Sequence, residues 1–149
     1  MYRDPTTRRN PRLTTGFDDL PAGLRAWAEG LLCLEAAVEL LIGNGSWLSR
    51  EDFAGIAIEF AADAGGMVMA SVDFTAAADA LEAGALPCSA GERRVLQIAA
   101  SLAAGVPVDL REAVTGLDAG NAALAAAAVL HTAGCGDLGA RLAGGQGRR

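Results

Sequence analysis

His131 and Cys135 are the pair of residues whose types and spacing come closest to a metal-binding or nucleophilic site. They stand four residues apart, so on one helix they would share a face and could bind one metal ion or form a thiol–imidazole pair. A zinc site needs three or four ligands, and Cys33 and Cys88 stand far away without Cys-x-x-Cys spacing. Gly134 also predicts a helix end before Cys135. We therefore expect no metal and no cofactor, with His131 and Cys135 kept as weak metal candidates.

Two pairs of carboxylates, Glu35/Glu39 and Glu59/Asp63, have the i,i+4 spacing of neighbours on a helix. Helical bundles that hold two metal ions combine inward-facing Glu with a Glu-x-x-His on two helices. Here Ala128 stands three residues before the single histidine, so that pattern fails. Two acidic residues at this spacing, without further ligand residues, are more typical of a solvated acidic face. An enzyme with an unrecognised carboxylate site, such as Glu59 and Asp63 in a cleft, is kept as an alternative.

The absence of lysine excludes several kinds of catalysis, because all 12 basic residues are arginine. Schiff-base chemistry, the P-loop and the Ser-x-x-Lys pair each need a lysine amine. Residues 134–139 match Gly-x-Gly-x-x-Gly, but that motif binds a dinucleotide only between a strand and a helix. Since no nucleophile–base pair converges either, the sequence predicts no catalytic and no cofactor-binding residue and argues against an enzyme.

Charge divides the chain into an acidic body and two basic ends. Residues 1–12 hold four Arg and one Asp, residues 138–149 hold three Arg, and residues 13–137 hold five Arg against 17 acids. Nucleic-acid affinity comes largely from neutralising phosphate, and the expected last helix, 119–133, carries no Arg or Lys. Nucleic acid is therefore not the expected partner. A weak nucleic-acid-associated regulator that uses the Arg-containing ends is the alternative.

The sequence gives no sign of a secretion signal or a membrane span. The N-terminal arginines are followed by Asp18 and Asp19 rather than by an apolar run, which is unlike a signal peptide. The longest uncharged run, residues 119–136, is rich in alanine and holds few large apolar side chains. An odd number of widely spaced cysteines fits a reducing compartment. We expect a cytoplasmic protein without membrane contact.

Apolar periodicity predicts an all-α fold, a compact bundle of five or six helices in one domain. The chain contains 33 Ala and 35 Leu, Ile, Val and Phe together, so its core is built from small side chains. Residues 1–15 read as a flexible basic arm, residues 16–135 as the single helical domain, and residues 136–149 as a flexible Gly/Arg tail. Residues 67–72 are ambiguous, either one short extended segment or a packed loop.

Start and stop signals place the helices along the chain. A first helix is expected over 20–42, and a second opens at Ser49 and Asp52 and runs to residue 64. Ser89 and Glu92 form a capping box before a helix that ends at Gly105. Helices are further expected over 75–83, 110–117 and 119–133, the last two capped by Asp109 and Asp118.

The expected helix over 20–42 carries an unbroken apolar stripe with 4-3 spacing. An interaction role is predicted for five residues of this stripe: Leu24, Trp27, Leu31, Leu34 and Val38. Such a stripe is more often the core-facing side of one helix than a self-associating coil. Because small side chains give little burial per residue, a second subunit would also cover it. The predicted partner is thus a protein, with a second copy of the chain in a homodimer as one candidate.

Three blocks of the chain resemble a known set of sequences. The blocks GFDDLPAGLRAWAEG (16–30), ELLIGNGSWLSREDF (39–53) and CSAGERRVLQIAASLAAGVPVDLREAVTGLD (88–118) are similar to an uncharacterised family of small bacterial proteins from GC-rich genomes. The resemblance covers about residues 16–133 and implies no activity, cofactor or catalytic residue. The function expected from the sequence is therefore a non-catalytic helical protein-interaction module, accessory or regulatory.

Deletion of residues 1–15 is expected to leave the stability of the domain nearly unchanged. A polar arm with Pro5 and Pro11 contributes little apolar surface to a core. Thermal melts of the full-length and truncated chains test this prediction. A fall in melting temperature of more than about 4 °C would show that the arm packs on the domain.

Overall fold

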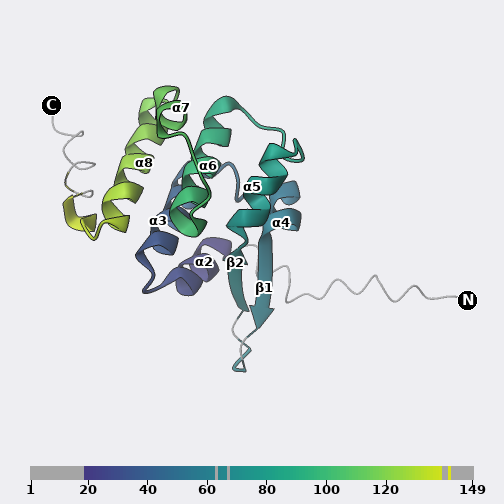
Figure 1. The fold of residues 1–149 in the computed structure, drawn as a ribbon. Coiled ribbons are helices and arrows are strands. Elements are labelled where there is room, and N and C mark those ends of the chain that lie inside the picture. The colour runs from purple at the N-terminus through teal and green to yellow at the C-terminus, as the bar shows by residue number, and fades with distance from the viewer. Residues whose placement is uncertain (1–18, 63, 67, 139–140, 142–149) are drawn as a thin grey trace, which may run out of the picture.

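The computed structural model describes residues 19–62, 64–66, 68–138 and 141, and these form a helical domain with one small sheet (Figure 1). The elements in chain order are α2 (Leu20–Ala28), α3 (Leu32–Asn44), α4 (Glu51–Ala57), β1 (Ile58–Ala62), β2 (Val68–Val72), α5 (Phe74–Glu82), α6 (Ala90–Ala104), α7 (Leu110–Thr115) and α8 (Ala119–Thr132). The mostly helical fold is confirmed. The expectation of a purely α-helical bundle of five or six helices is wrong, because β1 and β2 form an antiparallel sheet. The predicted arm at 1–15 lies outside the described residues, as does most of the predicted tail.

The expected single helix over 20–42 is wrong because the chain breaks at Gly30. Gly30 has φ 87°, in the left-handed region that favours glycine, and it separates α2 from α3. The carboxylate of Glu35 accepts a hydrogen bond from the Gly30 N–H at 3.0 Å. The break turns Leu31 outward, and its side chain is 58% exposed. The apolar stripe therefore does not continue across residue 30.

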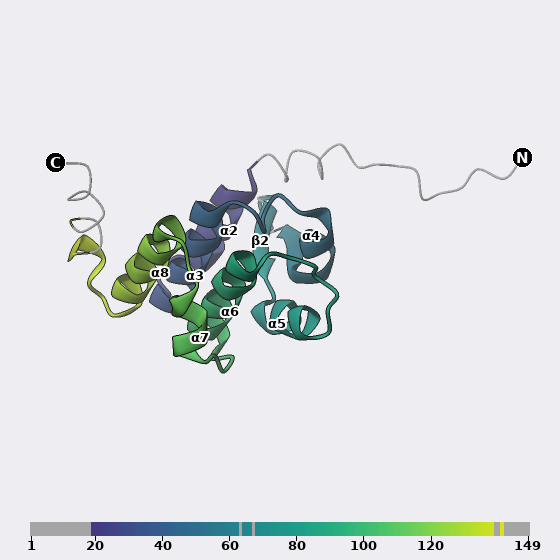
Figure 2. The same cartoon turned by 90° about the horizontal axis from the view of Figure 1, so that it is seen from above.

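With the chain broken there, α3 becomes the central helix and packs against α2, α6 and α8. Its buried residues lie on more than one side of the helix: Ala36, Ala37, Val38, Leu40 and Leu41. This distribution is what a helix covered by neighbours on several sides requires. Figures 1 and 2 show α8 and α6 beside α3, with α4, α5 and the sheet on the other side of the molecule.

The expected helix to residue 64 is also wrong beyond Ala57, where α4 ends and β1 begins. β1 pairs with β2 in an antiparallel register that sets Ile58 opposite Val72 and Ala62 opposite Val68. Within the ambiguous segment, residues 68–72 are thus extended, and their partner is the segment that the apolar spacing assigned to a helix. Ile58 and Val72 are buried, and their β-branched side chains suit a pleated surface.

The remaining helix starts are confirmed by their caps. Ser89 and Glu92 form the predicted capping box at the start of α6. The side chains of Asp109 and Asp118 accept backbone N–H bonds at the starts of α7 and α8. Asp73 caps α5, which begins at Phe74, one residue before the expected start at residue 75. Each of these four helices therefore begins where a short polar side chain satisfies free backbone donors.

The predicted capping box at Ser49 and Asp52 does not form. The Ser49 hydroxyl donates to the carbonyl oxygen of Ser46 at 2.8 Å, and Arg50 is the N-cap of α4 without a side-chain cap bond. Asp52 accepts instead from the Arg50 guanidinium at 2.6 Å.

Among the described residues, no helix is long and apolar enough to cross a membrane.

Leu24 and Leu31 give a matched test of the break at Gly30. Leu24 is fully buried, so Leu24→Ala should reduce the free energy of unfolding by about 2–5 kcal/mol. Leu31→Ala removes the same atoms from an exposed site and should cost less than about 1 kcal/mol. Denaturant melts of both variants measure the difference. Equal losses would indicate one continuous helix with Leu31 in the core.

Candidate functional site

Two adjoining cavities between α2, α3 and α8 bring together groups from distant parts of the chain. Their volumes are about 430 Å³ and 390 Å³, and both are lined by Arg25, Glu39 and His131. We call the larger of them the α3–α8 hollow and the smaller its polar mouth. Two helix faces with i, i+3, i+4, i+7 spacing line the hollow: Ala36, Glu39, Leu40 and Gly43 of α3, and Leu124, Ala127, Ala128 and His131 of α8.

The single histidine is bonded to a carboxylate in this mouth. His131 Nε2 lies 2.9 Å from Glu35 Oε1, although the two residues are 96 positions apart in the chain. Glu35 also accepts from the Gly30 N–H through its other oxygen. The hydrogen bond with His131, together with that from Gly30, lowers the pKa of Glu35 below its ordinary value. Glu35 thus connects the end of α8 to the turn between α2 and α3.

A second pair stands beside the first, between α2 and α3. Arg25 Nε donates to Glu39 Oε1 at 2.6 Å and Arg25 Nη2 to Glu39 Oε2 at 3.3 Å. Hydrogen bonding to Glu39 raises the pKa of Arg25. Their side chains are 53% and 52% exposed, so this pair contributes about 0–1 kcal/mol to stability.

These contacts correct the interpretation of the predicted carboxylate pairs. Glu35 and Glu39 do not form a purely solvated acidic face, because each is bonded to a basic side chain of another helix. Glu59 lies exposed on β1 rather than on a helix. Asp63, its predicted partner in the alternative carboxylate site, lies outside the described residues. The active-site interpretation of Glu59 with Asp63 thus stays a prediction.

His131 and Cys135, the weak metal candidates, do not belong to a metal centre among the described residues. Cys135 is exposed, and its thiol has the Ala133 carbonyl oxygen at 3.9 Å, whereas His131 bonds to Glu35. Gly134, with φ 79°, follows the end of α8 as predicted. In the ranges that the structure describes, no three His, Cys, Asp or Glu side chains are grouped so that they could hold a metal ion.

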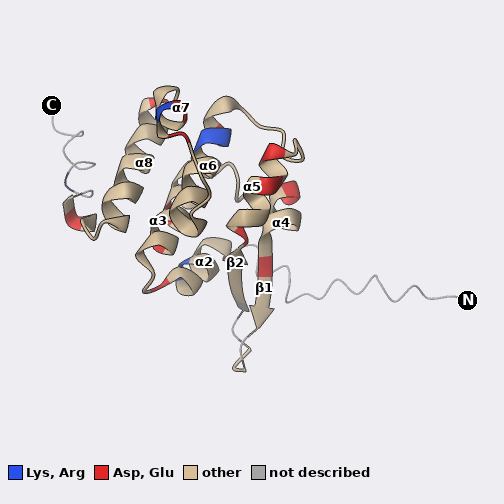
Figure 3. Cartoon of the chain, viewed as in Figure 1, with Lys and Arg blue, Asp and Glu red and all other residues tan. Residues whose placement is uncertain are grey.

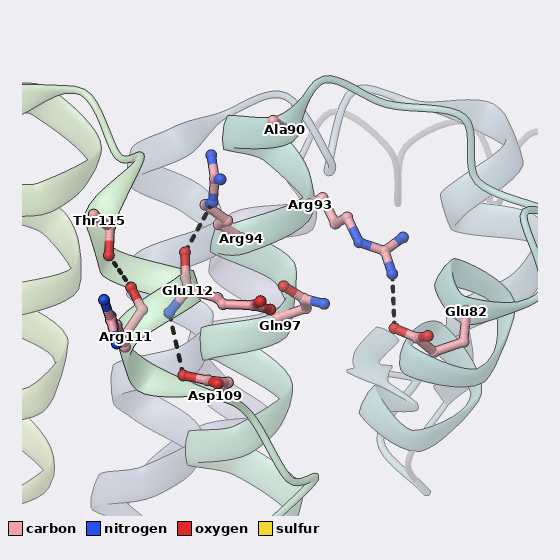
Figure 4. A pocket seen from close by; sticks show the side chains of 9 residues that line it. All are labelled: Glu82, Ala90, Arg93, Arg94, Gln97, Asp109, Arg111, Glu112 and Thr115. Carbon is pink, nitrogen blue, oxygen red and sulfur yellow. Dashed lines mark hydrogen bonds and ion pairs between the residues drawn. The ribbon is translucent and has the colours of Figure 1, made fainter.

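A polar cleft of about 840 Å³ lies between α5, α6 and α7 (Figure 4). Its charged lining is balanced, with three arginines and three acids: Arg93, Arg94, Arg111, Glu82, Asp109 and Glu112. Arg93 pairs with Glu82 at 2.8 Å, and Arg94 Nε donates to the carbonyl oxygen of Glu112 at 3.1 Å. These contacts connect α6 to α5 and to α7. Because the charges cancel, the cleft favours neither an anion nor a cation.

The outward side of α8 is a third feature, and it is uncharged along its whole length. Figure 3 shows no Lys, Arg, Asp or Glu on α8, and its one histidine, His131, faces Glu35 of α3. The exposed residues of α8 and the position after it define what we call the α8 outer face: Ala119, Gly120, Ala122, Ala123, Ala126, Val129 and Ala133. By contrast, α5 exposes Thr75, Asp79 and Glu82.

Most of the exposed large apolar side chains among the described residues belong to α3, α7, α8 and the segments next to these helices. They are Leu31 and Leu32 at the start of α3, Leu110 and Val114 on α7, Val129 on α8, and Leu138. Only Ile56 and Met69, among the described residues, lie elsewhere. Figures 1 and 2 both place α7 and α8 opposite α4, α5 and the sheet.

The five residues with a predicted interaction role are distributed differently. Leu24 and Val38 are fully buried in the core, and Trp27 and Leu34 are half-buried against it. Of the five, Leu31 is the one that is exposed. Their interaction role stays a prediction. Sequence reasoning gave no signal for the α8 outer face beyond the absence of charge between residues 119 and 136.

Comparison of the chain with family models, with curated proteins and with solved structures finds no match. The resemblance to a family of small bacterial proteins therefore stays a prediction.

The Glu35–His131 contact predicts a specific dependence of stability on pH. The lowered pKa of Glu35 means that its carboxylate stabilises the fold above the pKa of the unfolded chain, and that this contribution disappears as the pH falls through the folded pKa. The melting temperature of the parent chain should therefore exceed that of Glu35→Gln near neutral pH, and the gap should close as the pH falls through the folded pKa of Glu35.

Thermal melts across this pH range, with the exposed Glu59→Gln as the control, test the prediction. Glu59→Gln should follow the parent chain at every pH. A gap for Glu35→Gln that stays constant as the pH falls would show that the carboxylate charge of Glu35 does not stabilise the fold.

Proposed function

We propose that this chain is a protein-interaction module that acts through binding rather than catalysis, with the α8 outer face at the centre of its contact surface. The observation that carries the proposal is the exposure of a complete helix face without one charged side chain. A surface helix of a globular protein ordinarily presents charged or polar residues to water. A face made of Ala, Gly and Val has instead the composition of a helix face that packs against another element.

Covering this face with a partner carries a small desolvation penalty. Burying a charged or hydrogen-bonding side chain without a partner is expensive, and the α8 outer face has none to bury. Each apolar Å² removed from water contributes about 25 cal/mol. Alanine side chains also lose almost no rotamer entropy on contact. A partner helix therefore gains apolar burial without a matching desolvation penalty.

The occupant that fits best is a second copy of this chain. In a two-fold pair the same face lies on both partners, and an uncharged face can meet itself without placing like charges in contact. Small side chains allow two helices to pack at the close end of the usual 8–10 Å range. The formal net charge of −6 acts at longer range and opposes association.

The size of the surface sets the expected strength of the dimer. A helix of 14 residues is about 21 Å long and about 10–12 Å across, so α8 alone offers a few hundred Å². A stable interface buries about 800 Å² on each partner. The exposed side chains of Leu110 and Val114 on α7 would have to extend the contact. We therefore expect a dimer that dissociates on dilution.

The nucleic-acid alternative has less support from the described residues. Arg25, Arg50 and Arg93 are each paired with a carboxylate, and Arg94 donates to two backbone carbonyl oxygens. A phosphate would have to compete with these oxygens for the same donors. The predicted basic ends lie mostly outside the described residues, and their contribution stays a prediction.

Ala126→Arg and Ala83→Arg test the proposal as a matched pair. Both alanines are exposed, but Ala126 lies in the middle of the α8 outer face and Ala83 follows α5 on the other side of the molecule. Arginine makes the chain less negative at either site, so lost association cannot come from greater overall repulsion. Sedimentation equilibrium should show a dimer for the parent chain and for Ala83→Arg, and a monomer for Ala126→Arg, in which association is weakened.

Circular dichroism of both variants checks that the fold is kept. A parent chain that stays monomeric at concentrations of hundreds of micromolar would contradict the homodimer. Equal association by both variants would contradict the placement of the contact on the α8 outer face.

A further inference from the structure

The α3–α8 hollow has the construction of a small-molecule site, and it is separate from the α8 outer face. Ligand sites are concave and mostly apolar, have volumes of about 300–1,000 Å³, and carry a few polar groups that orient the ligand. The hollow has a volume of about 430 Å³. Its apolar lining comes from two helices that lie against each other: Ala36, Leu40, Ile42, Leu124, Ala127 and Ala128.

The polar groups gather at one end of this apolar lining. Arg25, Glu39 and His131 line both the hollow and the adjoining smaller cavity named its polar mouth, and Glu29 and Glu35 line that smaller cavity alone. Three helices supply four of these side chains, and Glu29 follows the end of α2. A molecule with an apolar body in the hollow would therefore place its polar head among them.

The charge at the mouth selects the kind of head group. One arginine faces three carboxylates, those of Glu29, Glu35 and Glu39, and His131 is already hydrogen-bonded to Glu35. The net charge of these side chains is negative whether His131 is neutral or charged. An anion would have to displace Glu39 from both nitrogens through which Arg25 holds it and would then face the remaining carboxylates.

A positively charged head group finds free acceptors in the same place. An ionised carboxylate offers about four lone-pair sites, and Glu35 and Glu39 each use two of them in the contacts described above. An ammonium group carries three N–H donors and no acceptor. The Arg25–Glu39 pair is half-exposed, so it can rearrange around a bound head group at little cost.

We propose that the α3–α8 hollow binds a small organic ammonium ion, with its apolar tail between α3 and α8 and its head group against Glu39 and Glu35. This ligand site does not depend on the proposed dimer, because Ala127 and Leu124 line the hollow from a different side of α8 than the exposed Ala126.

A set of four small probes tests both halves of the site: n-hexylammonium, hexanoate, 1-hexanol and methylammonium. Titration of each into the ¹⁵N-labelled full chain is followed by amide chemical shifts. n-Hexylammonium should shift the amides of residues 36–43 and 124–131 and bind at least tenfold more tightly than hexanoate. Methylammonium, which lacks the tail, and 1-hexanol, which lacks the charge, should each bind at least fivefold more weakly than n-hexylammonium.

Two variants and a control locate the binding. Glu39→Gln should weaken n-hexylammonium binding at least fivefold and leave 1-hexanol unchanged, whereas Ala127→Leu, which fills the hollow, should weaken both. Glu59→Gln, on the exposed face of β1, should change neither. Near-native amide spectra of each variant show that the fold is kept.

The same titration with Ala126→Arg separates this proposal from the proposed function. Unchanged n-hexylammonium binding by that variant supports a site independent of association. No shift at residues 36–43 and 124–131, equal affinity for the charged and neutral probes, or tighter binding of hexanoate would each overturn the ammonium site without bearing on the dimer.

Discussion

The antiparallel packing of α8 on α3 is the contact on which the other features of the structure depend. Two hydrogen bonds mark its ends. Asn44 Nδ2, at the end of α3, donates to Asn121 Oδ1 near the start of α8 at 3.0 Å, and His131 meets Glu35 at the opposite end. Between them the helices approach closely, because a Cβ atom on Gly43 would lie 2.6 Å from Leu124 Cδ2. Glycine at position 43 thus lets a leucine lie directly against the α3 backbone.

This packing divides α8 into two faces with different consequences. The inner face buries Ala125 and Ala128 and, with α3, lines the hollow whose mouth holds the two acid–base pairs. The opposite face is left uncovered by the described residues and carries no charge. The break at Gly30 serves the same arrangement, because it frees α3 to pack on several sides and places Glu35 where His131 reaches it. One helix pairing therefore accounts for both the proposed ligand site and the proposed contact surface.

The sequence was sufficient for the three helices whose starts are set by a nearby cap. The caps at Asp109, Asp118 and Ser89 lie within three residues of the N–H groups that they accept from, so their patterns predicted α6, α7 and α8. The hairpin was missed because Phe53, Ile56 and Phe60 are spaced as on a helix, whereas strand pairing with Val68–Val72 is a tertiary choice. The bond between Glu35 and His131 joins positions 96 residues apart, and no spacing rule reaches that far.

The central claim is that the uncovered face of α8 is where a second copy of this chain packs. The most direct measurement is an isotope-filtered NOE experiment on an equimolar mixture of ¹³C-labelled and unlabelled chains at concentrations where a weak dimer is populated. A dimer through the α8 outer face predicts intermolecular NOEs that involve the methyl groups of Ala122, Ala126 and Val129. Intermolecular NOEs confined to Ile56 and Met69 on the other side of the molecule, or none at all, would contradict it.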